Sequence, residues 1–386
     1  MSDHASDVSR HARARLCLST LVEPGDPRLP LLIGEHGVEG VLAAAREDRP
    51  LEGRALPRAW TDRAAAAQAA ADAALERARA VRLRWIVPGD REWPGRLDDL
   101  DRATPHAGST GAPLGLWVRG EVDLAPLLER TVSIVGARSH TEYGRQCAAE
   151  IAADVADQGH TVVSGAAFGI DVAAHRGALA VGGPTVAVLA CGADVDYPRT
   201  HAGLLSRVAE TGAVVSEQLP GQTPMRSRFL SRNRIIAALG CGTLVVEAAR
   251  RSGSLNTLHW ADALGRVTMA LPGPVTSAQS LGTHQAVRDG LAQLITGGRD
   301  VLLALGAVAD AEESAGPTGP PPDPALALVG RVLDALSFER PVTTGEVAAH
   351  ARGAPADVES VLGRLAAHGW CSRAGDLWVL RRLPTA

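Results

Sequence analysis

The chain has 386 residues, 46% of them hydrophobic and 21% charged, which is enough for two or three domains that each bury a core. Its formal net charge of −4 excludes a uniformly basic nucleic-acid coat, so any such site must be a local patch. Five scattered cysteines without a CxxC pair argue against a zinc site or a disulfide framework. No signal core or apolar run of membrane-spanning length is present, and we expect a cytoplasmic protein without a membrane partner.

The first part of the chain, residues 1–85, consists of short apolar segments separated by turn residues. These segments predict a small helical N-terminal domain. Its longest expected element is one alanine-rich helix over residues 61–81, capped by Thr61 or Asp62. Farther on, residues 116–118 are typical of a strand.

The middle of the chain alternates short, β-branched apolar runs with amphipathic helical stretches. The expected strands cover residues 132–135, 161–164, 185–190, 213–216, 243–246 and 267–270, with a seventh at 292–295. Such alternation indicates a parallel sheet with helices on both faces. We therefore predict an α/β fold with an extended Rossmann-like parallel sheet domain over residues 86–306. Its ligands should lie at the carboxyl edge of the strands.

The last part of the chain begins with residues 307–324, which are rich in Pro and Gly and predict a linker. Beyond it, three helices are expected at 326–336, 343–350 and 356–368, and a hairpin pairs 370–373 with 377–380. Three helices and a two-stranded wing predict a C-terminal winged helix over residues 325–386. Asp357 and Glu359 lie on the presumed recognition helix, which disfavours a sequence-specific regulator that reads the major groove.

The turn after the first central strand carries Gly136, Ala137 and Arg138, and a helix is expected from residue 143. A strand, a glycine turn and a helix N-terminus together present free N–H groups and a positive dipole end to an anion. Arg138 adds a guanidinium whose fork suits phosphate oxygens. The turn is therefore a candidate phosphate site, although glycine after a buried strand is often no more than a tight turn.

Two further loops place glycine or small hydroxyl residues where a ligand backbone would lie. One follows the strand at 161–164, and the other precedes the helix that ends near residue 264, where the alternative is a simple N-cap. The candidate residues in them are Ser164, Gly165, Gly169, Ser252, Gly253 and Ser254.

A cluster of arginines with one aromatic residue is expected in a loop before a helix over residues 233–239. Guanidinium groups would bind phosphates, and the ring would stack on a base. An ordinary solvated loop would carry the same residues, so the two interpretations remain open at this point. The cluster consists of Arg226, Arg228, Phe229, Arg232, Asn233 and Arg234.

An enzymatic alternative is a nucleotide or ribosyl-phosphate processing enzyme on the same sheet, with Glu217 or Glu247 as the acid–base. Either glutamate could instead pair with a neighbouring arginine. A dinucleotide site is disfavoured because the first turn lacks the GxGxxG spacing, and no P-loop, HExxH motif or catalytic triad is evident. We therefore expect neither a cofactor nor a metal, and the enzymatic alternative remains open at this point.

Several of these segments together resemble the DprA/Smf family of bacterial DNA-processing proteins. The motifs run in one order from about residue 93 to 305. They are IVGAR (134–138), SGAAFGID (164–171), SRNRIIAAL (231–239), SGSLNT (252–257) and LPG (271–273). The chain departs from the usual pattern at Phe229-Leu230, where the family has Phe-Pro, and at Asn256-Thr257, where it has Thr-Ala.

The resemblance implies a protein that binds single-stranded DNA independently of sequence and loads the RecA recombinase during DNA uptake, natural transformation and recombination. It also implies a homodimer formed through the central domain. The family's DNA pocket uses the arginine of the first turn, here Arg138, a basic residue that corresponds to Arg226 or Arg228, and Phe229.

Overall fold

The computed structural model describes residues 9–306, 324–337, 340–367 and 371–380. The chain forms two compact units, divided between residues 309 and 310. The linker predicted at 307–324 lies outside the described residues except for its last position. Within the described ranges, no helix combines the length and the apolar character needed to span a membrane.

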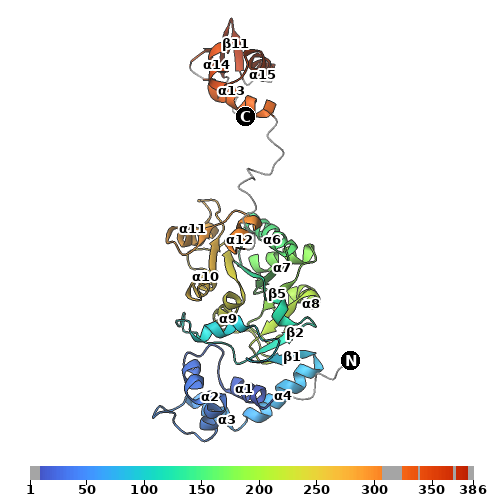
Figure 1. The fold of residues 1–386 in the computed structure, drawn as a ribbon, viewed down its shortest axis with the longest axis vertical. Coiled ribbons are helices and arrows are strands. Elements are labelled where there is room, and N and C mark those ends of the chain that lie inside the picture. Colours follow the sequence, from blue (N-terminus) through green and yellow to red (C-terminus); the bar gives the residue numbers. More distant parts are fainter. Residues whose placement is uncertain (1–8, 307–323, 338–339, 368–370, 381–386) are drawn as a thin grey trace. The chain divides into compact units, whose positions relative to one another are not determined.

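The first unit opens with four helices, drawn in blue in Figure 1. They are α1 (Arg10–Leu21), α2 (Leu29–Arg46), α3 (Arg58–Ala64) and α4 (Ala67–Ala80). The single helix predicted over 61–81 is wrong, because the chain bends at residues 65 and 66. This bend brings Trp60 of α3 and Ala71 of α4 into one core with α1. The alanine-rich sequence favours helix on both sides of the bend and does not mark it.

This helical core continues directly into the sheet. It includes Leu83, Leu114 and Trp117, and the rings of Trp85 and Trp117 lie 4.7 Å apart. The helices therefore pack on one edge of the sheet as part of the same compact unit.

The sheet of this unit has nine strands, seven of them parallel to one another. Their order is β1-β2-β6-β5-β4-β3-β7-β8-β9, and β1 and β2 run antiparallel at one edge. The predicted Rossmann-like parallel sheet is thereby confirmed. The strands are β1 (Leu83–Ile86), β2 (Leu116–Arg119), β3 (Thr131–Val135), β4 (Thr161–Ser164), β5 (Thr185–Val188), β6 (Ala213–Ser216), β7 (Gly242–Val245), β8 (Val267–Ala270) and β9 (Gln293–Leu294).

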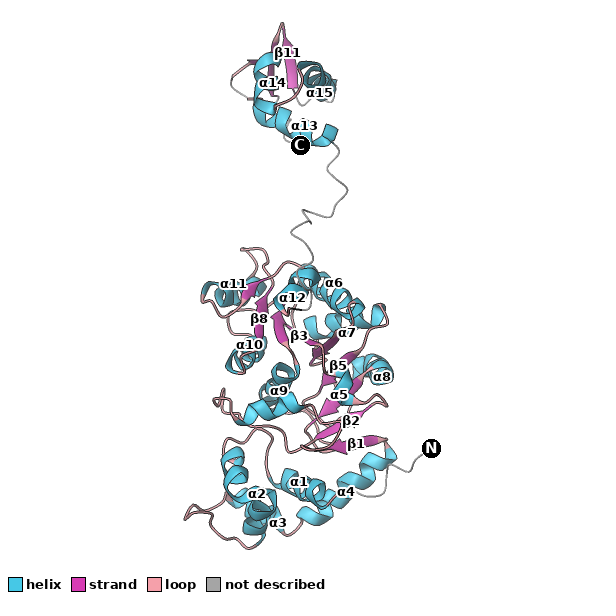
Figure 2. Cartoon of the chain, viewed as in Figure 1, coloured by secondary structure: helices cyan, strands magenta, loops and turns pink. Residues whose placement is uncertain are grey.

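Helices cover both faces of this sheet (Figure 2). Val132 and Ile134 of β3 pack against α6 and α7, whereas Val135 faces the core of α9 and α10. This alternation is the period-2 pattern of a strand buried on both sides. The remaining elements are η1 (Gly95–Asp101), α5 (Leu124–Leu127), α6 (Glu142–Asp157), α7 (Ile170–Ala180), η2 (Arg199–His201), α8 (Ala202–Thr211), α9 (Arg226–Leu239), α10 (Gly253–Ala263), η3 (Ala278–Ser280), α11 (Leu281–Arg288) and α12 (Gly298–Ala304).

The strand order reverses between β3 and β7. The chain moves from β3 outward to β6, and α9 then carries it back to β7 on the other side of β3. In sheets of this kind the loops at the carboxyl ends of the two central strands diverge and leave a crevice. The most favourable place for a ligand is therefore the end of β3 and β7.

The second unit has its own core, which contains Val347, Val358, Leu362 and Trp378. Thr343 and Glu346 form a capping box at the start of the second helix of this unit. Three helices and a three-stranded sheet of order β10-β12-β11 include the elements expected of a winged helix, with β10 in addition, and that assignment stays a prediction. The elements are α13 (Pro324–Ala335), β10 (Val342–Thr343), α14 (Thr344–Ala351), α15 (Pro355–Ala367), β11 (Cys371–Ala374) and β12 (Leu377–Leu380).

A buried ion pair fixes α9 in the first unit. The guanidinium of Arg234 donates to both carboxylate oxygens of Glu217 at 2.6 Å, and its Nε donates to the carbonyl of Gly111 at 2.9 Å. The two side chains are only 1% and 5% exposed. Such a pair holds α9 to the end of β6.

Replacing Glu217 by alanine should leave the Arg234 guanidinium buried without a counter-charge. We expect the free energy of unfolding to fall by about 3–5 kcal/mol, measured by urea denaturation. Glu210→Ala removes an exposed glutamate of α8 and serves as the control, with little change expected. An equally small effect of both substitutions would contradict the anchoring role of the pair.

Candidate nucleic-acid interface

A groove of about 820 Å³ lies at the carboxyl ends of β3 and β7, where the strand order reverses. Its walls are the turn after β3, the start of α9 and the start of α10. An adjoining pocket is bounded by Gly165, Phe168, Tyr197 and Phe229. Of the residues predicted for the site, those that line the groove are Gly136, Ala137, Arg138, Arg226, Phe229, Arg232, Asn233, Ser252, Gly253 and Ser254.

Arg138 stands at the mouth of this groove with its charge exposed to solvent. Its Cζ lies 4.6 Å from the centroid of the Phe229 ring, which is half-buried. The Tyr197 ring lies a further 6.0 Å from that of Phe229. The ring holds the guanidinium in place from one side and leaves its N–H donors free. In the described part of the chain, no carboxylate pairs with Arg138.

The helix N-terminus after this turn is not the anion site that the sequence predicts. Helix α6 begins at Glu142, and its cap Thr141 donates its backbone N–H and its hydroxyl to the carboxylate of Glu247, at 2.8 and 2.5 Å. The chain's own carboxylate therefore already compensates the helix dipole. Within the described ranges, the N–H groups of Arg138 and Ser139 find no acceptor, and the anion-binding capacity of the turn depends on them.

The arginine cluster is helical and not a loop, because α9 already begins at Arg226. The helix turns its arginines in different directions. Arg226 is exposed at the groove, whereas Arg228, Arg232 and Arg234 are buried. The prediction of four phosphate-binding arginines is corrected accordingly.

Arg228 links α9 to the N-terminal helices. Its Nη2 and Nε donate to the two carboxylate oxygens of Glu23 at 3.1 and 3.2 Å, and its Nη1 donates to Gln222 and to the carbonyl of Thr223. All three guanidinium nitrogens are thus engaged. Between the two basic residues that the family resemblance left open, Arg226 is the one available to a ligand.

Arg232 lies beneath the loop that follows β4. Its Nη1 donates to the carbonyl of Val188 at 2.8 Å, and a Cβ added at Gly165 would lie 1.6 Å from the same nitrogen. Asp171 accepts from the N–H groups of Gly165 and Ala167 at 3.2 and 3.4 Å. Burial lowers the pKa of Arg232 to about 10 and raises the pKa of Asp171. Asp171 therefore holds this loop by hydrogen bonds, and Arg232 packs against its backbone at Gly165.

Two other predicted residues are structural. The hydroxyl of Ser164 donates to the carbonyl of Ile134 at 2.6 Å within the sheet. Gly169 has a φ of +90°, and a Cβ there would lie 2.2 Å from the carbonyl oxygen of Ala137. Glycine at this position lets the loop after β4 touch the turn after β3.

The start of α10 forms the opposite wall. Ser252 caps the helix by accepting from the N–H of Ser254, and the two hydroxyls lie 2.8 Å apart. Asn233 of α9 donates to the carbonyl of Gly253 at 3.2 Å, so its amide joins α9 to α10. The predicted loop with Ser252, Gly253 and Ser254 is therefore the N-terminus of α10, and it faces the groove.

Several residues at this site escaped the sequence analysis. Arg251 lines the groove and is exposed, and its neighbour in the chain, Arg250, is exposed as well. Phe168 is 51% exposed at the rim of the adjoining pocket, and its ring meets that of His201 at 4.7 Å. The chain has only three phenylalanines and two tyrosines. This rarity could have drawn attention to the pocket, because three of these five rings line it.

The enzymatic alternative loses both of its acid–base candidates. Glu217 is buried and bound to Arg234, and Glu247 is buried and caps α6. A Cβ at Gly144 would lie 2.3 Å from the Glu247 carboxylate, which shows how tightly it is enclosed. Neither carboxylate is free to move a proton at a substrate.

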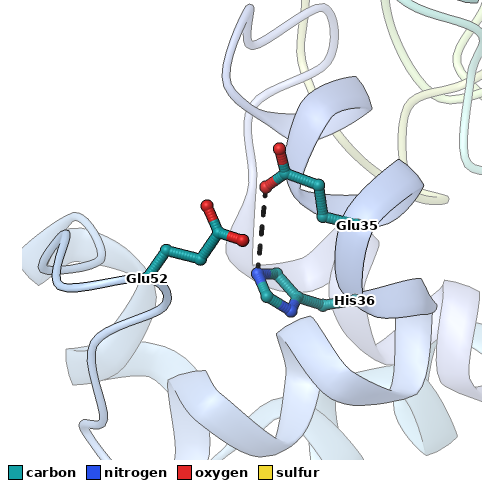
Figure 3. A group of neighbouring side chains, drawn as sticks. All are labelled: Glu35, His36 and Glu52. Atoms are coloured by element: carbon teal, nitrogen blue, oxygen red, sulfur yellow. Dashed lines mark ion pairs between the residues drawn. The ribbon is translucent and has the colours of Figure 1, made fainter.

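A group of side chains that could share a metal ion occurs elsewhere, at Glu35, His36 and Glu52 (Figure 3). Nε2 of His36 lies 3.9 Å from Glu35, and both glutamates are exposed. None of the three residues lines the groove. Exposed acidic groups beside a histidine are common without a metal, so this group carries no assignment.

Residues 84–306 match the family described as DNA recombination-mediator protein A. Over 377 residues the chain is 40% identical to the "Putative DNA processing protein DprA" of Mycobacterium tuberculosis, which covers 96% of this chain and 95% of that protein. It is 39% identical over 222 residues to the protein Smf of Escherichia coli, which covers 57% of this chain and 56% of that protein.

Solved structures agree with these relatives. DNA processing protein A of Streptococcus pneumoniae matches with a TM-score of 0.62 and 31% identity, over 77% of this chain and 98% of that one. The Helicobacter pylori protein, solved for its single-stranded DNA binding mode, matches with a TM-score of 0.50 and 26% identity, over 58% of this chain and 96% of that one. The resemblance that the motifs predicted is confirmed, and the chain belongs to the family of DNA recombination-mediator protein A, the DprA/Smf family.

Proposed function

We propose that this chain binds single-stranded DNA independently of sequence, in the groove at the ends of β3 and β7. The observation that carries the proposal is the exposed guanidinium of Arg138 stacked on Phe229 at the groove mouth. A cation beside a ring offers one contact to a phosphate and one to a base. The single-stranded DNA binding of the Helicobacter pylori relative supports the same assignment.

Sequence independence follows from which donors remain free. The exposed cations Arg138, Arg226 and Arg251 suit phosphates, which carry no base identity. The amide of Asn233, which could otherwise read a base edge, is already bound to Gly253 and Asn256. Stacking on a ring accepts any base.

The family further suggests a mediator that delivers the bound strand to a RecA recombinase in the cytoplasm, in recombination and natural transformation, without catalysis of its own. We also propose a homodimer through the central sheet. Leu294 on the edge strand β9 is 53% exposed, and among the described residues this strand pairs only with β8.

The proposed function is tested by fluorescence anisotropy with single- and double-stranded oligonucleotides of several sequences at several salt concentrations. We expect preference for single strands, equal affinity across sequences, a linear loss of affinity with log salt, and no turnover of nucleotides. Preference for duplex of one sequence, or turnover of a nucleotide, would refute it.

Substituting Arg138 by alanine should weaken single-strand binding by about 1.5–3 kcal/mol, because a charge-assisted contact is lost. The slope of log affinity against log salt should become shallower by about 0.7, since one phosphate contact disappears. The thermal midpoint should stay near that of the wild type because the side chain is exposed. Unchanged affinity and slope would remove Arg138 from the site.

The two arginines on the first turn of α9 should behave oppositely. Arg226→Ala should reduce affinity for all oligonucleotides alike and leave stability intact, because this side chain is exposed at the groove. Arg228→Ala should lower the thermal midpoint, because Glu23 and Gln222 lose their partner. DNA titration and thermal melting of both variants make the comparison. A loss of affinity confined to the folded Arg228 variant would invert our assignment.

Phe229→Ala tests stacking. We expect a loss of about 1–3 kcal/mol in single-strand affinity, and almost none for an abasic oligonucleotide of equal length, because that strand has no base to stack. The ring is half-buried, so the stability loss should stay below the roughly 3–5 kcal/mol of a core Phe→Ala change. A large stability loss with undiminished binding would show that Phe229 serves the core alone.

A further inference from the structure

The first turn of α10 holds hydrogen-bond donors that nothing in the described chain uses. The helix has eleven residues, and Ser252, Gly253 and Ser254 at its start line the groove. Within the described ranges the N–H of Gly253 has no acceptor. The hydroxyls of Ser252 and Ser254 share one hydrogen bond, so one of their two protons remains free. A helix N-terminus of this kind attracts anions.

Thr257 gives a second and independent indication at the same place. It lines the groove one helical turn beyond Gly253, is only 1% exposed, and its hydroxyl has no hydrogen-bond partner among the described residues. Several other buried threonines of this unit donate to carbonyl oxygens, as Thr131 does to Leu239 and Thr185 does to Val162. The Thr257 hydroxyl is not among the fully buried groups without a partner in the described chain, so it opens on the groove, where a bound phosphate can supply the missing partner.

Arg251 supplies the charge that these donors lack. It directly precedes the cap residue Ser252, is exposed, lines the same groove and forms no ion pair in the described chain. One wall of the groove therefore carries the guanidinium of Arg251, the free N–H of Gly253 and the hydroxyls of the serine pair and of Thr257. Such a donor set fits the oxygens of a phosphate group.

We propose that the first turn of α10, with Arg251 and Thr257, is a second phosphate-binding site of the groove. The inference rests on the proposed function, because the phosphate belongs to the same strand that Arg138 contacts. Arg138 follows β3 and Arg251 follows β7, which are paired neighbours in the sheet. Both residues line the same groove, so the two sites can bind a single DNA strand from both sides of the place where the strand order reverses.

The first experiment compares Thr257→Val with Thr243→Val. Thr243 is a second buried threonine whose hydroxyl lacks a partner, and it does not line the groove. Neither substitution removes a hydrogen bond within the described chain, so neither should lower the thermal midpoint. We expect Thr257→Val to weaken single-strand binding about 3- to 10-fold, and Thr243→Val to leave it unchanged.

The second experiment uses Arg251→Ala, an exposed position whose loss does not threaten folding, with the exposed Arg299→Ala of α12 as its control. Arg251→Ala should make the salt slope shallower by about 0.7, and Arg299→Ala should leave it as in the wild type. Oligonucleotides with one neutral methylphosphonate then locate the contact. At one position, the neutral methylphosphonate should weaken binding to the wild type. The same substitution in the oligonucleotide should not change the affinity of the Arg251→Ala and Thr257→Val variants.

A comparison of oligonucleotides with and without a 5′-phosphate identifies the source of the phosphate. If the substitutions weaken only 5′-phosphorylated strands, the site takes a terminal phosphate, and if they weaken all strands, it takes an internal one. Wild-type affinity and salt slope in both Thr257→Val and Arg251→Ala would overturn the second site while Arg138→Ala still weakens binding. A wild type without single-strand affinity would instead overturn the proposed function.

Discussion

The position of α9 depends on the buried ion pair between Arg234 and Glu217, and the binding groove depends on α9. Both charges are almost fully removed from water, and each guanidinium nitrogen of Arg234 has a partner. A pair of this kind tolerates only one geometry, because a shifted partner would leave a buried charge unmatched. It fixes the helix whose first turns carry Arg226 and Phe229.

Along this one helix, arginine has two physical roles. Arg228 and Arg232 use their planar donors inside the protein: Arg228 donates to Glu23, and Arg232 donates to the carbonyl of Val188 at the end of β5. Arg226 leaves its donors to solvent. Guanidinium suits both roles because it keeps its charge when buried and satisfies several acceptors at once. The buried arginines thereby hold Arg226 and Phe229 at the edge of the sheet.

The free N–H donors of this sheet lie at other positions than in many doubly wound sheets. In many doubly wound sheets the helix after the first strand receives a phosphate at its N-terminus. Here Glu247 occupies that position at α6. The free donors lie instead on the turn around Arg138 and at the start of α10.

The sequence by itself determined the parallel sheet and its helices, because strand periodicity and glycine turns are local properties, and it predicted a candidate site at the turn after β3. Only the tertiary structure decided which charged groups are free. Glu23 lies 205 residues from Arg228, and Glu247 lies 106 residues from Thr141. The bend between α3 and α4 was likewise decided by packing on α1, since alanine favours helix on either side. Burial and pairing join distant segments, and no local pattern records them.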